Sequence, residues 1–503
     1  MRSSIVLLLL VATDLAAHLG LQKPQPLNGL RNLATHARPF QRLSPESKKS
    51  NLDVQPQFFD QLVDHFDPKN AATFQQQFWA NDQWYAKNEL VFLMLGGAED
   101  ADATFITNET MECAKLGKEF GAMMYTLEHR YYGQSLPFDD IPTENLKQLS
   151  SSQAIEDIAN FIKAMNKKNG FKNPKWILFG GSYAGSLAAW ARQKHPELVH
   201  GAVASSAPME AVVDFNQFLE VVVDVIQRYD KTCATNLHKA FTNLQALLKT
   251  AAGRHGVRTA ISTCGDLDGS KPENMNIFWK GVFTPFMTMI QYQYDNINFF
   301  KNTINDREVC VFMNDESNKN VIKRFSLALR ILMLYTQETC VVTSYKDYVD
   351  HLKITYPLND RAWEWQTCTE FGYFVSTESP TAGPFFGAQN GTTMPIDWLL
   401  EECSLVFGSQ FNPESVRKAV QTTNQRYGGA SNFNATKVLF TNGKNDPWHL
   451  VGITKSPNSL TPAILMDGVA SCADMFPEAA DEPASLKKAR KVIHATVASW
   501  VYH

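Results

Sequence analysis

The chain has 503 residues, which exceeds the usual size of one domain, so we expect either one large domain with an insertion or two domains. Hydrophobic residues make up 44%, aromatic residues 11% and charged residues 19%, a composition that excludes wholesale disorder. The net charge of −4 gives no reason to expect a nucleic-acid partner, which would usually need a basic stripe.

The N-terminus has the pattern of a targeting segment. Met1 and Arg2 precede an apolar run over residues 5–12 and a stretch of small residues, which together predict a signal peptide over 1–17. A buried N-terminal helix is the alternative interpretation. The run is too short to cross a bilayer, and no later stretch of about 20 apolar residues follows, so we expect no transmembrane segment. Residues 18–54 are polar and are expected to form a flexible leader.

Cysteines and sequons agree with secretion, either to the outside or into a lumenal compartment such as the lysosome. An even number of cysteines in a secreted chain indicates disulfides, although eight cysteines allow 105 pairings. They form no C-x-x-C pair, so we predict no metal site, and nothing indicates a cofactor. Three N-x-T sequons begin at Asn108, Asn390 and Asn434. The cysteines are Cys113, Cys233, Cys264, Cys310, Cys340, Cys368, Cys403 and Cys472.

Short apolar runs alternate with helical patterns on both sides of a different middle region. Such alternation predicts a parallel sheet covered by helices on both faces. The runs lie at 90–95, 122–127, 176–179, 201–204, 437–440 and 463–466, and the helical patterns at 152–166, 186–194 and 485–500.

Residues 209–404 are mostly amphipathic helix and contain six of the eight cysteines. We therefore predict one α/β domain in two parts, residues 55–208 and 405–503, which a helical cap over residues 209–404 interrupts. The cap would lie over the active site.

The segment from Trp176 to Trp190 has the pattern of a nucleophile elbow. A buried strand leads into Gly180-Gly-Ser-Tyr-Ala-Gly185 and then into a helix, which would place the hydroxyl of Ser182 above the edge of the sheet. The amides of Tyr183 and Gly97 are the expected donors to an oxyanion. A serine that only caps a core helix is the alternative.

The elbow and the helical cap together predict an α/β-hydrolase fold, and in that fold the nucleophile is followed in the chain by an acid and then a histidine. Asp446 fits the place of the acid because it follows the strand at 437–440 across a short turn. An aspartate that only belongs to a surface turn is the alternative.

Six motifs together resemble the prolyl-carboxypeptidase-like serine peptidases, a family that includes lysosomal Pro-X carboxypeptidase, dipeptidyl peptidase II and thymus-specific serine protease. The resemblance spans about residues 58–500. It implies that Ser182 is the nucleophile and Asp446 the triad acid. The motifs are FDQLVDHF at 59–66, GG at 96–97, EHRYYGQS at 128–135, GGSYAG at 180–185, QTCTE at 366–370 and NGKNDPW at 442–448.

One departure from the family pattern affects the expected activity most. The family's catalytic histidine precedes the cysteine of a C-x-D-M stretch, and here that position is Ser471. A hydroxyl cannot accept a proton near neutral pH as an imidazole does, so Ser182 would remain a weak nucleophile. His449, three residues after Asp446, is the nearest alternative base, whereas His494 and His129 are expected to be structural.

These observations leave several functions open. The favoured hypothesis is a secreted, catalytically impaired pseudo-peptidase that binds peptide or protein ligands and forms a homodimer or larger assembly. The main alternative is an active carboxypeptidase or dipeptidyl peptidase that cleaves beside proline, in which Glu370 of the family's pocket segment would contact a peptide amino terminus. An ordinary exposed glutamate is the other interpretation of Glu370. A lipase or esterase would leave the motifs outside the elbow unexplained.

Overall fold

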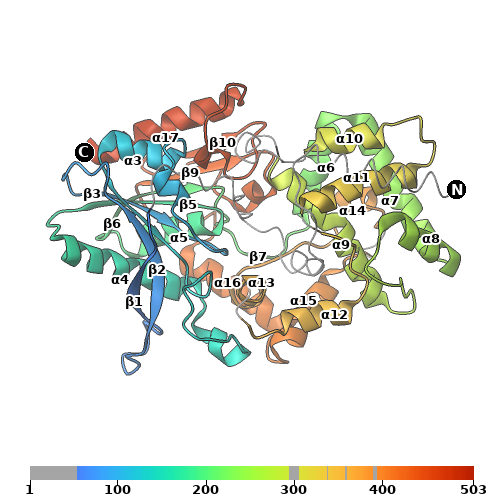
Figure 1. Ribbon diagram of the computed structural model, residues 1–503, viewed down its shortest axis with the longest axis horizontal. Coiled ribbons are helices and arrows are strands. Elements are labelled where there is room, and N and C mark those ends of the chain that lie inside the picture. The colour runs from blue at the N-terminus through green and yellow to red at the C-terminus, as the bar shows by residue number, and fades with distance from the viewer. Residues whose placement is uncertain (1–53, 294–304, 337, 357–358, 389–392, 503) are drawn as a thin grey trace.

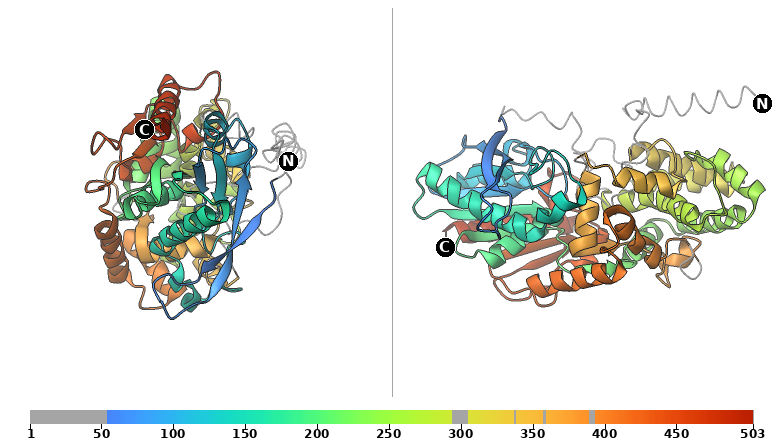
Figure 2. Two further views of the ribbon diagram at one scale, coloured as in Figure 1. Left: turned by 90° about the vertical axis from the view of Figure 1, so that its left-hand side faces the viewer. Right: turned by 90° about the horizontal axis from the view of Figure 1, so that it is seen from below.

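The computed structural model describes residues 54–293, 305–336, 338–356, 359–388 and 393–502. The predicted signal peptide, the leader up to residue 53 and the sequon at Asn390 lie outside these residues. An eight-stranded sheet with its helices forms one end of the molecule, and a group of helices from the middle of the chain forms the other (Figure 1). The C-terminal helix lies at the sheet end (Figure 2).

The sheet has the strand order β1-β2-β4-β3-β5-β6-β9-β10. From β4 to β10 every neighbouring pair is parallel, whereas β1 and β2 add an antiparallel edge. All six predicted strands are confirmed, and β1 and β2 were not predicted. The bounds are β1 Gln57–Leu62, β2 Thr73–Asn81, β3 Leu90–Leu95, β4 Met123–Leu127, β5 Lys175–Gly181, β6 Val199–Ser205, β9 Val438–Gly443 and β10 Ala463–Met466.

Helices cover both faces of the sheet, which explains why the central strands are apolar throughout. In β3, Leu90 and Phe92 belong to a core with α3 and α17, whereas Val91 and Leu93 belong to the core that contains α4 and α5. Fully burying one such side chain contributes about 1.5–3 kcal/mol. The four helices are α3 Glu112–Phe120, α4 Ser151–Asn169, α5 Tyr183–Lys194 and α17 Ala484–Tyr502. Two short elements, α2 Thr104–Thr107 and η2 Thr143–Gln148, precede α3 and α4 in the chain.

A helical insertion separates β6 from β9, so the predicted α/β-hydrolase fold with an inserted helical region is confirmed. It also contains a two-stranded sheet of β7 Val212–Asp214 and β8 Gly372–Phe374. None of the described helices is both long and apolar enough to cross a membrane. The helices are α6 Gln217–Tyr229, α7 Lys231–Leu248, α8 Ala251–Ile261, α9 Pro272–Gln291, α10 Asp306–Met313, α11 Val321–Tyr335, α12 Tyr345–Leu352, α13 Asn359–Gln366, η3 Thr367–Phe371, α14 Ala382–Phe385, α15 Ile396–Phe407 and α16 Pro413–Tyr427.

Three disulfides join the six cysteines of the insertion. They are Cys233–Cys310, Cys264–Cys340 and Cys368–Cys403, and they close loops of 77, 76 and 35 residues. Closing loops of this length typically stabilises a fold by about 2–4 kcal/mol per bridge. Cys113 and Cys472 are buried thiols in the sheet domain. The expectation of disulfides is therefore confirmed.

Candidate active site

Ser182 lies in the turn between β5 and α5, where its backbone adopts a strained conformation. Its φ is 55° and its ψ is −128°, values that a residue other than glycine adopts only when the surrounding structure enforces them. The amide of Ser182 donates a hydrogen bond to the carbonyl of Ser205 at the end of the neighbouring strand β6, at 2.8 Å. The serine is thus held at the carboxyl edge of the parallel strands, the geometry of a nucleophile elbow.

Two glycines make the elbow possible. A Cβ on Gly180 would lie 2.2 Å from the carbonyl oxygen of Ala184, and a Cβ on Gly185 would lie 2.9 Å from the carbonyl oxygen of Gly180. Neither distance is compatible with a side chain. Ala184 occupies the position of the second glycine in the usual G-x-S-x-G motif. An alanine is tolerated there because the closest approaches of the backbone in this turn are at Gly180 and Gly185.

Gly97 follows strand β3 and packs against the first turn of α5. A Cβ on Gly97 would lie 3.5 Å from the amide nitrogen of Ala184, so this backbone runs close beside the turn that carries Tyr183. Gly96, one residue earlier, donates its amide to the carbonyl of Leu127 at 2.8 Å. The assignment of the Tyr183 and Gly97 amides as oxyanion donors stays a prediction.

The hydroxyl of Tyr183 belongs to a buried network that fixes the tautomer of His129. Nδ1 of His129 lies 2.6 Å from the carbonyl of Arg130, and because a carbonyl can only accept, Nδ1 carries the proton. Nε2 therefore accepts from the Tyr183 hydroxyl at 3.1 Å, and burial lowers the pKa of His129 to about 4. Gln366 donates to the same hydroxyl at 3.0 Å and accepts from Tyr132 at 2.7 Å. Both nitrogens of His129 are thus engaged in structural hydrogen bonds.

Asp446 follows strand β9 and caps the short helix η4, Pro447–Val451. Its Oδ1 accepts the amide of Trp448 at 3.2 Å, whereas its Oδ2 has no hydrogen-bond partner among the described residues. Burial raises the pKa of this carboxyl to about 7, and the nearby Trp448 amide and the hydroxyls of Ser471 and Ser206 lower it in part. In a catalytic triad, the histidine donates a hydrogen bond to a buried carboxylate of this kind and so stabilises it.

Ser471 lies beside this carboxylate, just before the short helix η5, Ala473–Met475. Its amide donates to the carbonyl of Gln291 at the end of α9, at 2.9 Å. The amide of Cys472 donates to the hydroxyl of Ser206, the residue after the strand end that holds Ser182. Ser206, a buried residue that sequence reasoning missed, thus lies near Asp446 and bonds to the neighbour of Ser471, and it directly follows Ser205, which accepts the amide of Ser182.

His449 does not face the Asp446 carboxylate. Its Nδ1 lies 2.7 Å from the main-chain carbonyl of Asp446, and burial lowers the pKa of the imidazole. His494 lies on α17 and contacts Glu119 at 2.6 Å. In the described part of the chain, the hydrogen bonds of both histidines therefore go to groups other than Ser182 and the Asp446 carboxylate.

Glu370 lies in the π-helical segment η3 and is buried rather than exposed. Its two carboxylate oxygens accept hydrogen bonds from the amide of Ser151, at 2.8 Å, and from the Ser151 hydroxyl, at 2.6 Å. These bonds join the insertion to the start of α4. The carboxylate is thus occupied by the protein itself, and contact with a substrate stays a prediction.

Asp474 joins the ends of two neighbouring strands beside the site. This buried carboxylate accepts hydrogen bonds from Ser205 at 2.5 Å and from Thr441 at 2.8 Å, which joins the ends of β6 and β9. Sequence reasoning quoted this residue only as part of the C-x-D-M stretch and gave it no role. Its position after the expected histidine was the available signal.

One group among the described residues has the spacing of metal ligands, namely Glu364, Cys368 and Cys403. The two cysteines form a disulfide, so they offer no thiolate to an ion.

The sequence of the chain is similar to those of known serine peptidases. The family model described as "Serine carboxypeptidase S28" matches residues 61–493. The Caenorhabditis elegans protein K12H4.7, named as a serine protease, is 37% identical, with 92% of this chain and 91% of the relative covered. Human thymus-specific serine protease is 32% identical, with 95% and 93% covered, and human lysosomal Pro-X carboxypeptidase is 30% identical, with 88% of each covered.

Among solved structures the chain is similar to the proline iminopeptidase of Mycobacterium smegmatis, at 11% identity and a TM-score of 0.35, with 88% of this chain and 99% of that chain covered. The family model covers most of the chain, and the relatives match along nearly their whole length. The resemblance drawn from the six motifs is therefore confirmed. The chain belongs to the serine carboxypeptidase S28 family.

Proposed function

We propose that this protein is a catalytically impaired member of the family that binds peptides without turning them over efficiently. The observation that carries the proposal is the pair of Asp446, whose Oδ2 has no hydrogen-bond partner among the described residues, and Ser471, which stands at the position of the family's histidine. The elbow at Ser182 has the backbone geometry of a nucleophile. His129, His449 and His494, the described histidines considered as bases, all make their hydrogen bonds elsewhere, so we propose that the elbow has no base.

The size of the expected loss is large. Removing the triad histidine of a well-studied serine protease lowers turnover about a million-fold. The remaining contribution of oxyanion binding and positioning is roughly a thousand-fold over water. Tyr292, the residue after α9, cannot replace the base. Burial raises the pKa of its phenol well above the ordinary value, so the phenol stays protonated and accepts no proton from Ser182.

The ligand class follows from the relatives. Pro-X carboxypeptidase is named for cleavage beside proline, so proline-containing peptides are the ligands we propose. The amides of Tyr183 and Gly97 would hold the peptide carbonyl. The three disulfides support a secreted or lumenal location, because such bonds persist in oxidising compartments. A homodimer or larger assembly is part of the proposal, and light scattering of the purified protein tests it.

The experiment compares labelling of Ser182 by a fluorophosphonate probe, together with hydrolysis of a proline-containing peptide, in four proteins. These are the wild type, Ser471→His, Ser471→Asn and Ser471→His/Ser182→Ala. We expect slow labelling and no measurable hydrolysis in the wild type and in Ser471→Asn, which supplies similar bulk without a titrating base. Ser471→His should label on the order of a thousand-fold faster, and the double variant should not label.

Rapid labelling and turnover in the wild type would reject the proposal and support an active exopeptidase. Peptide binding is measured separately, by calorimetry with Ser182→Ala, in which hydrolysis cannot consume the ligand. No binding of proline-containing peptides in that measurement would remove the ligand class from the proposal.

A further inference from the structure

The surroundings of the Asp446 carboxylate contain hydroxyls, a thiol and a phenol where a triad would have an imidazole. The hydroxyls of Ser471 and Ser206 lie near the carboxyl, and Cys472 and Tyr292 lie close enough to interact with it electrostatically. Burial raises the pKa of the Cys472 thiol to about 12, so the thiol stays protonated. None of these groups accepts a proton from a serine at neutral pH.

The Asp446 carboxylate nevertheless keeps one of its two oxygens available to a hydrogen-bond donor. One oxygen is fixed by the Trp448 amide, and the other, fully buried, has no hydrogen-bond partner in the described part of the chain. The residue at the histidine position extends only to a hydroxyl, so its own side chain does not supply the five ring atoms of an imidazole. A buried polar atom without a partner is costly, which favours any ligand that can donate to it.

We propose that this place beside Asp446 and Ser471 binds an imidazole, either free in solution or on a histidine side chain of the bound peptide, and that the imidazole then acts as the missing base. This inference rests on the proposed function, since it requires that the protein itself supplies no base. An imidazole suits the place because one nitrogen can donate to the carboxylate while the opposite nitrogen accepts the proton of Ser182.

The chemistry balances without any further reactant. The Ser182 hydroxyl transfers its proton to the free imidazole nitrogen while its oxygen bonds to the peptide carbonyl carbon. The imidazolium then protonates the leaving amine as the carbon–nitrogen bond breaks, which leaves an acyl-serine. Water attacks the acyl group, gives its proton to the imidazole, and the serine oxygen recovers that proton when the ester bond breaks. A histidine-containing peptide would thereby assist its own cleavage.

The first arm of the test measures fluorophosphonate labelling of the wild type against the concentration of free imidazole. We expect an increase on the order of a hundred-fold that saturates, because a bound base contributes about 10²–10⁴-fold. 1-Methylimidazole is the matched control, since it accepts a proton but has no N–H to donate to Asp446, and it should give little increase. Asp446→Asn should remove the saturable increase, and Ser471→His should make labelling fast and independent of added imidazole.

The second arm distinguishes the free ligand from a side chain. A set of proline-containing tetrapeptides carries one histidine at each position in turn, and the matched set carries phenylalanine at the same positions. We expect hydrolysis of at least one histidine peptide and of no phenylalanine peptide, and we expect Ser182→Ala to abolish it. If free imidazole accelerates labelling but no histidine peptide is cleaved, the site takes the free ligand only.

The outcomes separate the two proposals. Fast labelling of the wild type without imidazole overturns the proposed function. Slow labelling that neither imidazole nor any histidine peptide changes, together with fast labelling of Ser471→His, leaves the proposed function standing and overturns this inference. Equal acceleration by imidazole and 1-methylimidazole also overturns it, because that result indicates a base acting from solution.

Discussion

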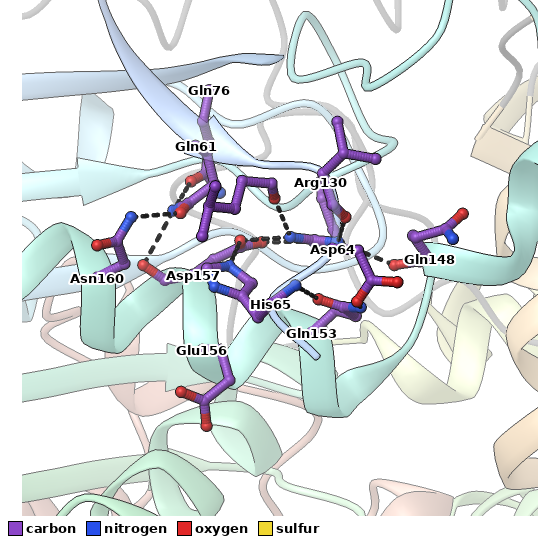
Figure 3. A network of polar contacts seen from close by, with 12 residues as sticks. Gln61, Asp64, His65, Gln76, Arg130, Gln148, Gln153, Glu156, Asp157 and Asn160 are labelled. Carbon is purple, nitrogen blue, oxygen red and sulfur yellow. Dashed lines mark hydrogen bonds and ion pairs between the residues drawn. The ribbon is translucent and has the colours of Figure 1, made fainter. Parts of the chain in front are cut away.

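Two buried aspartates of the sheet domain, Asp157 and Asp446, have opposite surroundings. Asp157 on α4 receives Nε and Nη2 of Arg130 at 2.6 and 2.5 Å and contacts Nε2 of His65 at 2.7 Å (Figure 3). Arg130 donates its remaining protons to main-chain carbonyls of Leu62, Val63 and Gln148. Every charge in this cluster is paired. Asp446 accepts one amide through Oδ1, and no described residue donates a hydrogen bond to its Oδ2.

The contrast distinguishes a carboxylate that stabilises the fold from one whose arrangement suits catalysis. The Asp157 cluster joins the N-terminal strand β1, the segment after β4 and helix α4, and its carboxylate is fully compensated. The second oxygen of the Asp446 carboxylate has no hydrogen-bond partner in the part of the chain that the structure describes, and burial raises the pKa of this carboxyl to about 7. We infer that Asp157 stabilises the native state, whereas ionised Asp446 destabilises it.

The largest stability effect is expected for Arg130→Met. The substitution leaves the Asp157 charge buried with only His65 beside it, and breaking a buried ion pair costs about 3–5 kcal/mol. Unfolding in guanidinium chloride, followed by fluorescence, measures the loss. The double variant Arg130→Met/Asp157→Leu removes both charges and should recover much of it. A loss below about 1 kcal/mol for the single variant would contradict the interpretation of this cluster as structural.

The opposite sign is expected for Asp446→Asn. The folded pKa of Asp446 is about 7 against a model value of 3.8, so between these values the native state binds a proton that the unfolded state lacks. Stability therefore falls as the pH rises from about 4 to about 7, and the loss is complete above that range. At pH 8 the neutral amide should be more stable than the wild type by up to roughly 4 kcal/mol, at about 1.4 kcal/mol per pKa unit.

Urea unfolding of Asp446→Asn and wild type at pH 5 and pH 8 measures this difference. The gain should be largest at pH 8 and clearly smaller at pH 5, because at pH 5 the folded carboxyl is still protonated and only the part of the loss between about pH 4 and pH 5 has occurred. Asp157→Asn is the matched control, because the same change at a paired carboxylate should destabilise at both pH values. Equal stabilities of the Asp446→Asn protein and the wild type at pH 8 would show that the Asp446 carboxylate is better compensated than its contacts indicate.

A smaller effect is expected for His65→Leu, which removes one of the two partners of Asp157. Arg130 still satisfies the carboxylate through two hydrogen bonds, so the loss should be about 1.5–3 kcal/mol, the value of a hydrogen bond to a charged group. Denaturant unfolding measures it, with His494→Leu as the control at an exposed pair on α17. A loss as large as that of Arg130→Met would show that the histidine rather than the arginine holds the cluster.

The sequence predicted the parallel part of the sheet because those strands are continuous apolar runs. β3 and β10 have the predicted bounds, and the elbow at Ser182 follows from its glycines. The antiparallel strand β2 escaped prediction because it contains three consecutive glutamines at 75–77. Gln76 is nevertheless buried, and its side-chain oxygen accepts a hydrogen bond from the side-chain amide of Gln61 in β1 at 2.8 Å, which makes the burial of this polar group possible. A pairing between distant glutamines leaves no periodic signal in either segment.

The candidate site was predictable only in part for a related reason. Asp446 and the substitution at Ser471 were found from motifs along the chain. Ser206 carries no motif, and its contact with Cys472 joins residues 266 positions apart. Glu370 was expected either to contact a substrate or to be an ordinary exposed residue. Only the exposed alternative is wrong, because folding of the insertion brings η3 against α4 and buries Glu370 on Ser151. Sequence motifs identify chemical groups, whereas burial and pairing depend on the folded chain.

The smallest effect is expected for Tyr183→Phe. This variant tests a buried network of uncharged groups, in contrast to the paired carboxylate of Asp157 and the partly hydrogen-bonded carboxylate of Asp446. The Tyr183 hydroxyl donates to His129 and accepts from Gln366, so its loss leaves two buried groups without a partner and should cost about 1–2 kcal/mol. A cycle with Gln366→Leu, measured by urea unfolding, should give a coupling of about 1 kcal/mol, because each single change breaks the same hydrogen bond. Zero coupling would mean that the amide of Gln366 is satisfied elsewhere, and the cap would then not restrain the elbow through this contact. A positive coupling would make the Tyr183 hydroxyl the point at which the inserted helices hold the turn beside Ser182.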